Sequence, residues 1–497
     1  MSATTNQVLL ATIAAAIVLG AAWILKLNST MKQTPPEMLA ASPHRWTEEE
    51  MRDTYQHIKA NPIDWAQHLP PKLDRRYIVT GGSGGVGGQI VLHLLARGHP
   101  PSSIRIVDFR TPFRADMSQG PAKLVGFAQA DITSIPATSA ALSKPWPADV
   151  AHLPLTVFHT AAIIVPAERS RRTYDRVKRV NIDGLRNVLS ASREAGASVF
   201  VSTSSASVAY RPVGFWGNPL RRWPRRYWQI VDEADFDAPL RPHADFFSNY
   251  AHTKAVGERV VAEADEPGFR TGMVRPANGV YGCSDGDQVV GWSLRAGTVP
   301  TWMRNVVQNF VSVGHVSLAH LLFEAALLED ESVSSGTTPK CAGRPFTVTD
   351  AGPPPMYDDV YNLLKATAET RPIVPVYLQP GIMLAVSYVV EWIDLVSRMP
   401  VLRWIVPRPT GDLAMLQPAV FTAGTHYLAS DAAARRSIDN GGIGYKPIHN
   451  SLEGMCQQVL EFNIEHQGYG RQDKQSSRQT LVEGVKNMGS TSAAVGV

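Results

Sequence analysis

The stretch Tyr77-Ile-Val-Thr-Gly-Gly-Ser-Gly-Gly-Val-Gly-Gly-Gln-Ile-Val-Leu92 decides the fold of this 497-residue chain. Its first residues form an apolar run that predicts a strand, and the residues after the glycines repeat apolar side chains at helical spacing. Gly81, Gly84 and Gly87 lie between the two patterns, three residues apart. The first glycine permits a tight turn, the second lets the backbone approach a pyrophosphate, and the third lets the helix pack on its strand. The N–H groups at the start of that helix attract phosphate, so the stretch predicts a dinucleotide-binding turn.

An acidic residue follows where a dinucleotide-binding fold uses one. Residues 103–108 form a second apolar run that ends at Asp108, 21 residues beyond Gly87. A carboxylate there binds the adenosine ribose hydroxyls and repels a 2′-phosphate, which favours NAD as the cofactor. Arg110 lies two residues further on, and its guanidinium would accommodate that phosphate, so NADP stays open as the alternative.

Further apolar runs predict a doubly wound α/β domain with a Rossmann-type parallel sheet. They cover residues 124–132, 155–162 and 199–203 and alternate with helical patterns. Asp131 ends the first of these runs, where it either meets the adenine amino group or caps the following turn. Ile132 beside it and Thr160 at the end of the next strand are further predicted cofactor contacts. His159, between apolar positions, is interpreted as a buried core histidine with its polar atoms satisfied.

Composition excludes several classes of protein. The chain has 48 Lys and Arg against 44 Asp and Glu, which gives no bulk positive field for binding nucleic acid. The three cysteines, Cys283, Cys341 and Cys456, are scattered and lack metal-ligand spacing. We therefore expect reduced packing cysteines and no metal site.

The N-terminal run Val8–Leu25 is uncharged and apolar over 18 residues, which is about the minimum for a membrane-spanning helix. A cleaved signal peptide is the alternative. It is disfavoured because residues 1–7 contain no Lys or Arg, whereas Lys26 and Lys32 follow the run. The positive-inside rule then predicts a single-pass anchor with the catalytic domain in the cytoplasm, and we expect the endoplasmic reticulum membrane.

The whole chain divides into five predicted parts. Residues 1–30 are the anchor, and residues 31–75 are a linker that contains a short helix. A capping box at Thr47 and Glu50 starts this helix, which runs to about Lys59. Residues 76–280 form the cofactor-binding domain with an insertion at 211–242. Residues 281–465 form a smaller, mostly helical substrate-binding region, and 466–497 a disordered tail.

Three residues predict chemistry on an alcohol. Tyr250 and Lys254 lie four apart on one helix face, and Ser205 follows the fifth strand. A tyrosine that removes an alcohol proton near neutral pH needs its pKa lowered from about 10 to about 7, which takes about 4 kcal/mol. A neighbouring ammonium and a cationic nicotinamide ring would supply this potential, while a serine hydroxyl holds the reacting oxygen.

In this order the motifs resemble the extended short-chain dehydrogenase/reductases. The cofactor turn, Ser205 in Ser-Ser-Ala-Ser-Val and the Tyr250–Lys254 pair match that pattern, and Val274-Arg-Pro-Ala-Asn-Gly-Val-Tyr-Gly282 resembles the sixth-strand signature. Residues 157–162, 314–320 and 343–350 look most like the 3β-hydroxysteroid dehydrogenase branch, including the sterol-4α-carboxylate 3-dehydrogenases. The resemblance implies a catalytic Asn181 and a cofactor contact at Pro276. It also implies NAD-dependent oxidation of a sterol, steroid or related terpenoid 3β-hydroxyl, in some members with loss of a 4-carboxylate.

The patterns in two segments leave more than one structural interpretation open. The insertion carries Trp216 and the run Arg221-Arg-Trp-Pro-Arg-Arg-Tyr-Trp228, which suits either a membrane interface or a loop packed on its own domain. Residues 372–400 are apolar but interrupted by Glu391, Asp394 and Arg398. This favours an amphipathic helix that caps the substrate site or lies on the membrane, with core packing as a third alternative.

The predicted partners are a membrane and a lipophilic alcohol, and a homodimer is an open alternative. Two other functions compete. One is reduction of a small ketone, or modification of a nucleotide sugar, on the same fold. The other is a dinucleotide sensor without chemistry, which the joint presence of Ser205, Tyr250 and Lys254 disfavours.

Overall fold

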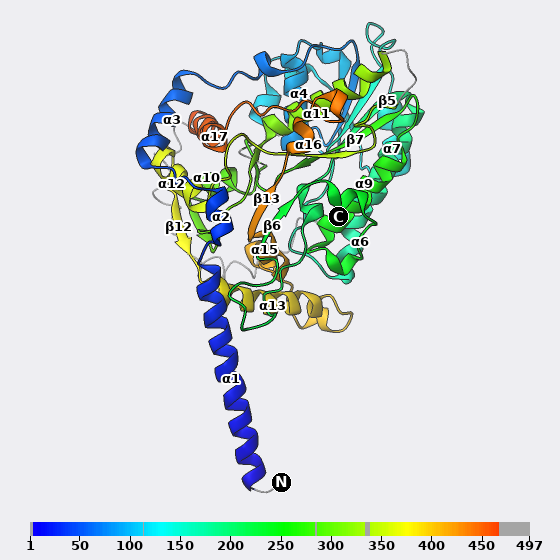
Figure 1. The fold of residues 1–497 in the computed structure, drawn as a ribbon. Coiled ribbons are helices and arrows are strands. Elements are labelled where there is room, and N and C mark those ends of the chain that lie inside the picture. Colours follow the sequence, from blue (N-terminus) through cyan, green and yellow to red (C-terminus); the bar gives the residue numbers. More distant parts are fainter. Residues whose placement is uncertain (1–2, 113, 284–285, 333–337, 467–497) are drawn as a thin grey trace.

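A seven-stranded parallel sheet forms the centre of the protein, in a computed structural model that describes residues 3–112, 114–283, 286–332 and 338–466 (Figure 1). The strand order is β11-β7-β5-β4-β1-β2-β3, and every neighbouring pair is parallel. The strands are β1 (Arg76–Thr80), β2 (Ile104–Asp108), β3 (Gly126–Gln129), β4 (Leu155–His159), β5 (Ala197–Thr203), β7 (Arg270–Pro276) and β11 (Pro345–Val348). The doubly wound sheet predicted from the sequence is confirmed.

The central strand β1 pairs with β2 on one side and β4 on the other, so the chain reverses its direction of travel across the sheet at this point. In open α/β sheets such a reversal opens a crevice at the carboxyl ends of the strands, and ligands bind there. The glycine turn, which follows β1, therefore lies at this crevice.

Helices cover both faces of the sheet, because successive strand residues point to opposite faces and both sets are apolar. Tyr77 and Val79 pack with α4 (Gly85–Ala96) and α11 (Val313–Ser332). Ile78 packs into the other face. The helices of that second face are α5 (Ile135–Ser143), α7 (Leu185–Glu194) and α9 (Asn249–Glu263), with the short α6 (Tyr174–Lys178) against α9.

Besides the core around the sheet, a second hydrophobic core lies next to it and includes helix α3 (Glu48–Ala60). Its capping box is present, because the Thr47 side chain accepts from the Glu50 N–H and Glu50 accepts from the Thr47 N–H. The helix predicted there is thus confirmed. It buries Met51, Tyr55 and Ile58 against α12 (Tyr357–Thr367) and α17 (Ser451–Glu465), with α10 (Val290–Ala296) in the same core. Residues of the predicted linker therefore contribute to the packing of the C-terminal part.

The smaller elements join distant parts of the chain. Three two-stranded parallel pairs are β8 (Val280–Tyr281) with β10 (Val311–Ser312), β9 (Thr298–Thr301) with β12 (Val374–Tyr377), and β6 (Trp228–Val231) with β13 (His426–Ala429). The short helices are α2 (Pro36–Ala41), α8 (Ala234–Asp237), α14 (Gly411–Met415), α15 (Pro418–Ala423) and α16 (Ala432–Arg435).

The long helix α1 (Ala3–Met31) projects from the body, with the N-terminus at its far tip (Figure 1). By length and composition, the helical segment 6–41 and α13 (Pro380–Ser397) are each able to cross a membrane. In the apolar part of the first segment no side chain is buried, whereas α13 is 44% buried. Ile382, Val386 and Val389 form an exposed apolar face on α13, and Leu384 and Val390 are buried, so the helix packs one face on the body and leaves a second apolar face outside.

The insertion packs against these two helices. Phe215 and Tyr227 are buried with Leu27 and Met31 of α1 and with Leu384 of α13. The insertion therefore packs on α1 and α13, and its contact with a membrane stays a prediction. The predicted tail, 466–497, lies outside the described residues except for His466, which follows the end of α17.

Candidate active site

The glycine turn has the geometry that its spacing predicts. Gly81 has φ of 72°, a left-handed conformation that favours glycine, and a Cβ there would lie 2.6 Å from the Ala161 main-chain nitrogen. A Cβ on Gly87 would lie 2.6 Å from the Thr160 hydroxyl oxygen, and it would also overlap the Gly81 carbonyl. Gly84 meets only that carbonyl, at 3.3 Å, and leaves its other side open at the start of α4. The turn is thus a cradle of the shape that a pyrophosphate requires.

Asp108 lies at the carboxyl end of β2, directly beside this turn. Its carboxylate accepts hydrogen bonds from the Ser83 N–H at 3.1 Å and the Arg110 N–H at 3.3 Å. The two bonds hold the acid against the glycine turn, where a ribose would reach it.

The other predicted cofactor contacts differ in their surroundings. The exposed Asp131 accepts from the Thr133 N–H at 2.9 Å, so this carboxylate caps a turn, as one of its two interpretations predicted. Ile132 is buried against Gly184, and Pro276 is buried at the end of β7. The Thr160 hydroxyl donates to the Thr80 carbonyl at 2.8 Å under the glycine turn. Thr160 and the turn are therefore brought together, while contacts of a cofactor with Asp131, Ile132 and Pro276 stay predictions.

Ser205, Tyr250 and Lys254 meet at the carboxyl end of β5. Ser205 follows the strand and its hydroxyl donates to Ser207 Oγ at 2.8 Å. Tyr250 lies in the first turn of α9, which Ser248 caps by accepting from the Ala251 N–H. Burial raises the pKa of Tyr250 to about 12, and hydrogen bonding with Ser205 offsets part of that rise. The lowered tyrosine pKa expected from the sequence is thus not a property of the protein alone.

Lys254 is held at the end of β5. Its ammonium donates to the Thr203 carbonyl at 2.8 Å, which ties α9 to the end of β5. Burial lowers the pKa of Lys254 to about 8, and the nearby Glu258 carboxylate opposes this shift. The lowered pKa of Lys254 therefore lies only slightly above neutral pH, where the side chain is still mostly protonated.

Sequence reasoning missed Glu258, which organises the floor of the site. Its carboxylate receives two hydrogen bonds of 2.7 Å from the Arg275 guanidinium and one of 2.6 Å from the Ser204 hydroxyl. Arg275 also pairs with Asp235 at 2.8 Å. The available signal was spacing, because Glu258 follows Lys254 by four residues on the same helix.

Asn181 lies in a π-helical turn, Arg179–Gly184, and its side chain is fully bonded. The side-chain oxygen accepts from the Ile163 N–H at 2.9 Å, and the amide donates to the Ile163 carbonyl at 3.1 Å and to Thr253 at 3.2 Å. Asn181 thus fixes the segment after β4 to α9, and its catalytic role stays a prediction.

His159 is a buried histidine with a hydrogen-bond partner, as predicted. Its Nδ1 lies 2.7 Å from the Thr80 hydroxyl, and burial lowers its pKa to about 3, with Lys254 contributing in the same direction. The three cysteines are also buried, as expected of packing residues.

The loop after β4 is joined to α13 by an ion pair, which we call the latch. The Arg169 guanidinium makes two hydrogen bonds of 2.7 Å with the Glu391 carboxylate. Arg398 of α13's C-terminal end pairs with Glu168 at 3.1 Å, and the Glu168 carbonyl accepts from the Asn249 N–H of α9. A movement of α13 would therefore shift the loop that contacts the start of α9, next to Tyr250.

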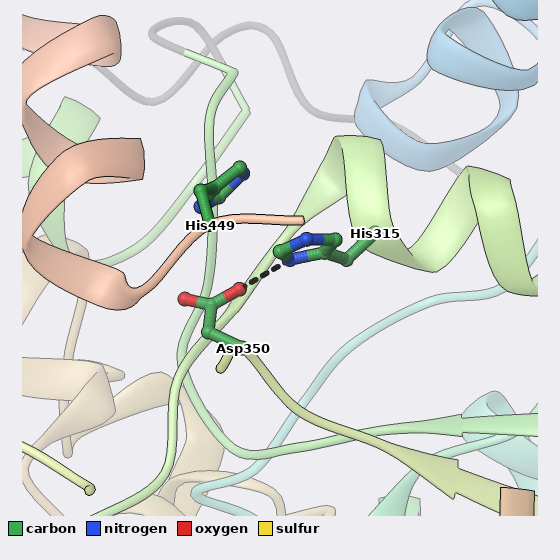
Figure 2. A group of neighbouring side chains, drawn as sticks. All are labelled: His315, Asp350 and His449. Carbon is green, nitrogen blue, oxygen red and sulfur yellow. Dashed lines mark hydrogen bonds and ion pairs between the residues drawn. The ribbon is translucent and has the colours of Figure 1, made fainter. Parts of the chain in front are cut away.

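One group of described residues has the composition of a metal site, namely His315, Asp350 and His449 (Figure 2). Asp350 already accepts from His315 Nδ1 at 2.7 Å, from Tyr281 and Ser451 hydroxyls, and from the Ser312 N–H. His315 Nε2 accepts from the Ile448 N–H, and His449 stacks on His315 with centroids 4.1 Å apart. With these lone pairs committed to protein donors, the group is a hydrogen-bonded core centre.

Comparison with known proteins places this site in a family. Residues 78–374, which contain the glycine turn, Ser205, Tyr250 and Lys254, match the 3-beta hydroxysteroid dehydrogenase/isomerase family. The chain belongs to this family. As a member of the 3-beta hydroxysteroid dehydrogenase/isomerase family it is a dehydrogenase that acts on CH–OH groups.

Relatives of this family member extend over most of its length. A 3 beta-hydroxysteroid dehydrogenase/Delta 5→4-isomerase of Mycobacterium tuberculosis is 29% identical over 307 residues, which are 60% of this chain and 70% of the relative. The human 3 beta-hydroxysteroid dehydrogenase type 7 is 27% identical over 411 residues, 77% of this chain and 94% of the relative. A solved UDP-glucose-4-epimerase from Stenotrophomonas maltophila matches with a TM-score of 0.51 and 18% identity over 79% of this chain and 98% of its own, which shows a shared fold.

Proposed function

We propose that the protein is a membrane-associated, NAD-dependent dehydrogenase that oxidises the 3β-hydroxyl of a sterol, steroid or related terpenoid to a ketone. The observation that carries the proposal is the meeting of Ser205, Tyr250 and Lys254 at the sheet edge that also bears the glycine turn. Family membership supports the substrate class.

Each residue of the triad has one task in this proposal. Tyr250 accepts the proton of the alcohol, and Ser205, which interacts with Tyr250, positions the reacting oxygen by a hydrogen bond. Lys254 holds its ammonium between Thr203 and the bound ribose, where it stabilises the phenolate. Bound NAD supplies the acceptor for the hydride that leaves the carbinol carbon, so the loss of hydride and proton gives the ketone.

The buried network keeps these groups in place. Glu258 lies one helical turn beyond Lys254 and favours its charged form, and Arg275 fixes the Glu258 carboxylate. Asn181 holds the segment after β4 to α9. These residues position the catalytic groups without touching the reacting atoms.

NAD is the proposed cofactor, with Asp108 as the residue that binds the adenosine ribose. Its carboxylate already faces the glycine turn through the Ser83 N–H. A 2′-phosphate in that place would meet a negative charge.

The exposed apolar surface supports membrane association. No residue in the apolar part of α1 is buried within the described structure, and α13 carries an outward apolar face with Trp392 63% exposed. We propose that α1 spans a membrane of the endoplasmic reticulum with the catalytic domain on the cytoplasmic side. We propose the corresponding division into an anchor (1–30), a linker (31–75), a cofactor domain (76–280), a substrate region (281–465) and a tail.

A substrate with a carboxylate at C4 would react further. Oxidation at C3 gives a β-keto acid, which releases carbon dioxide by breaking the C4–carboxyl bond, and the resulting enol takes up a proton. This step needs no added oxidant or further catalytic group.

The test uses the full-length protein in detergent micelles with NAD or NADP and a panel of 3β-hydroxysterols, with and without a 4-carboxyl group. We expect ketone and reduced cofactor in equal amounts, with NAD preferred. Binding of NAD without turnover of any alcohol would instead favour a dinucleotide sensor.

A further inference from the structure

A cavity of about 360 Å³ lies where α1 enters the body. One wall is formed by α1, including Trp23 and Lys26, and the other by the insertion, including Arg221, Arg222 and Arg225. We call it the basic pocket. Its volume lies in the range of roughly 300–1,000 Å³ that is typical of small-molecule sites.

The basic pocket concentrates positive charge without a counter-ion. Four of its lining residues are cationic, and none is acidic. Within the described part of the chain, no carboxylate lines the pocket beside these four cations. Like charges held close together repel, so an anion in the pocket would be attracted by all four.

Hydrogen bonds hold the two walls of the pocket together. The Lys26 ammonium donates to the Arg221 carbonyl at 3.0 Å and also to the Pro219 carbonyl. The Thr30 hydroxyl donates to the Arg222 carbonyl at 3.4 Å. The guanidinium of Arg222 lies 5.3 Å from the Trp223 ring centre, which limits its freedom. The main chain that carries the arginines is therefore tied to α1, while the side chains of Arg221, Arg222 and Arg225 are exposed to solvent.

The position of the pocket along α1 indicates its depth in a membrane. Lys26 is the first charged residue after the apolar run, and Trp23 marks the level at which aromatic rings sit among headgroups. Two residues beyond Lys26, the Asn28 side chain bonds to Gln379 at 2.9 Å and accepts from the Gly381 N–H at 3.0 Å. The amphipathic α13 thus starts beside the same level, across the base of α1 (Figure 1).

We propose that the basic pocket binds the phosphate-bearing headgroup of an anionic glycerophospholipid. Guanidinium groups match phosphate oxygens through paired hydrogen bonds, and the cavity lies at the depth where lipid phosphate is found. The proposal rests on the membrane association in the proposed function. A bound lipid would brace the insertion against α1 and so set the height of the body above the bilayer.

The test measures lipids retained by the full-length protein in a mild detergent, by native mass spectrometry, with phosphatidylserine, phosphatidylcholine or inorganic phosphate added. We expect one retained phosphatidylserine per chain, in preference to phosphatidylcholine. The triple variant Arg221→Gln, Arg222→Gln, Arg225→Gln should bind it at least about ten-fold more weakly. A second variant with Lys at the three positions keeps the charge and should retain part of the binding.

The matched control removes the same charge elsewhere, with Lys340→Gln, Arg435→Gln and Arg436→Gln at exposed sites on and near α16, away from α1 (Figure 1). It should bind like the wild type. Equal retention by wild type and the pocket variant, no preference for the anionic lipid, or equal binding of inorganic phosphate would overturn the proposal. Sterol turnover is measured on the same samples, so a failure of the proposed dehydrogenase function is seen separately from a failure of lipid binding.

Discussion

The Lys254 ammonium donates a 2.8 Å hydrogen bond to the Thr203 carbonyl and thereby fastens α9 to the carboxyl end of β5. Because Tyr250 lies one helical turn before Lys254 and Ser205 two residues after Thr203, this bond fixes the distance between the three proposed catalytic groups. Burying the charge is costly, as the lowered pKa of about 8 shows. The burial of this charge thus works against stability and points to a role of Lys254 in the reaction.

Replacing this lysine should separate activity from stability. Lys254→Met keeps the length of the side chain but removes the charge, and we expect kcat/KM to fall roughly 10²- to 10⁴-fold. The melting temperature should change little, because the relief from burying a charge offsets the loss of the hydrogen bond to the Thr203 carbonyl. Lys144→Met is the control, since exposed Lys144 also donates to a main-chain carbonyl, that of Phe127. Equal losses of activity in the two variants would contradict the role of Lys254.

The carboxylate at the end of β2 should set cofactor choice. Asp108→Ala removes the proposed ribose contact, and the ratio of kcat/KM for NAD over NADP should fall by about ten- to a hundred-fold, as expected for a charged hydrogen bond. Asp131→Ala, which removes a turn-capping carboxylate at the end of the next strand, should leave the ratio within about two-fold of wild type. A wild-type protein that already prefers NADP would refute the assignment of Asp108.

The latch between Arg169 and Glu391 should affect the sterol and not the cofactor. Glu391→Gln weakens the link between α13 and the loop after β4, and we expect KM for the sterol to rise roughly three- to ten-fold, or about 0.7–1.4 kcal/mol. The KM for NAD should be unchanged, because the glycine turn is not involved. Glu266→Gln, in an exposed pair with Arg193, is the control. A rise in the KM of NAD alone would show that the latch acts elsewhere.

The hydrogen-bonded centre around Asp350 should contribute to the free energy of unfolding, and metal ions should not change that contribution. Asp350→Asn leaves the buried partners of the carboxylate poorly satisfied, and denaturant titration should show a loss of about 3 kcal/mol, against little change for exposed Asp439→Asn. Chelators should change neither stability nor turnover. A metal that co-purifies in equal amount with the wild type and is lost in Asp350→Asn would contradict this interpretation.

The same carboxylate gives a pH dependence of defined sign. Burial alone would raise the pKa of Asp350, but the hydrogen bonds that its carboxylate accepts from His315 and Tyr281 bring it below the ordinary value. The stabilisation is therefore fully present above the ordinary aspartate pKa of about 3.9 and is lost as the pH falls below it. The free energy of unfolding of Asp350→Asn should fall less steeply than that of the wild type in this acidic range. If the free energies of unfolding of the wild type and Asp350→Asn changed in parallel with pH, the proposed contribution of the Asp350 carboxylate would be disproved.

The parts predicted from the sequence are those encoded by neighbouring residues. The glycine spacing, the Tyr250–Lys254 pair and the Thr47 capping box each lie within one short segment, so local geometry fixes them. The seventh strand, β11, is only four residues long and lies far from the other strands in the chain, which hid it from pattern reasoning.

The parts missed depend on contacts between distant segments. The Arg169–Glu391 latch joins residues 222 apart, and the parallel pair of β6 with β13 joins the insertion to the C-terminal region. The raised pKa of Tyr250 arises from burial in the folded site, so a pattern of residue types had no means of indicating it.

The most direct test of the account follows hydrogen from substrate to cofactor. A 3β-hydroxysterol carrying deuterium at C3 is incubated with the full-length protein and NAD, and the reduced cofactor is analysed by mass spectrometry. We predict one deuterium in the reduced nicotinamide for each ketone formed, and a loss of turnover of at least about 10²-fold in Tyr250→Phe. Unlabelled reduced cofactor, or full turnover by Tyr250→Phe, would contradict it.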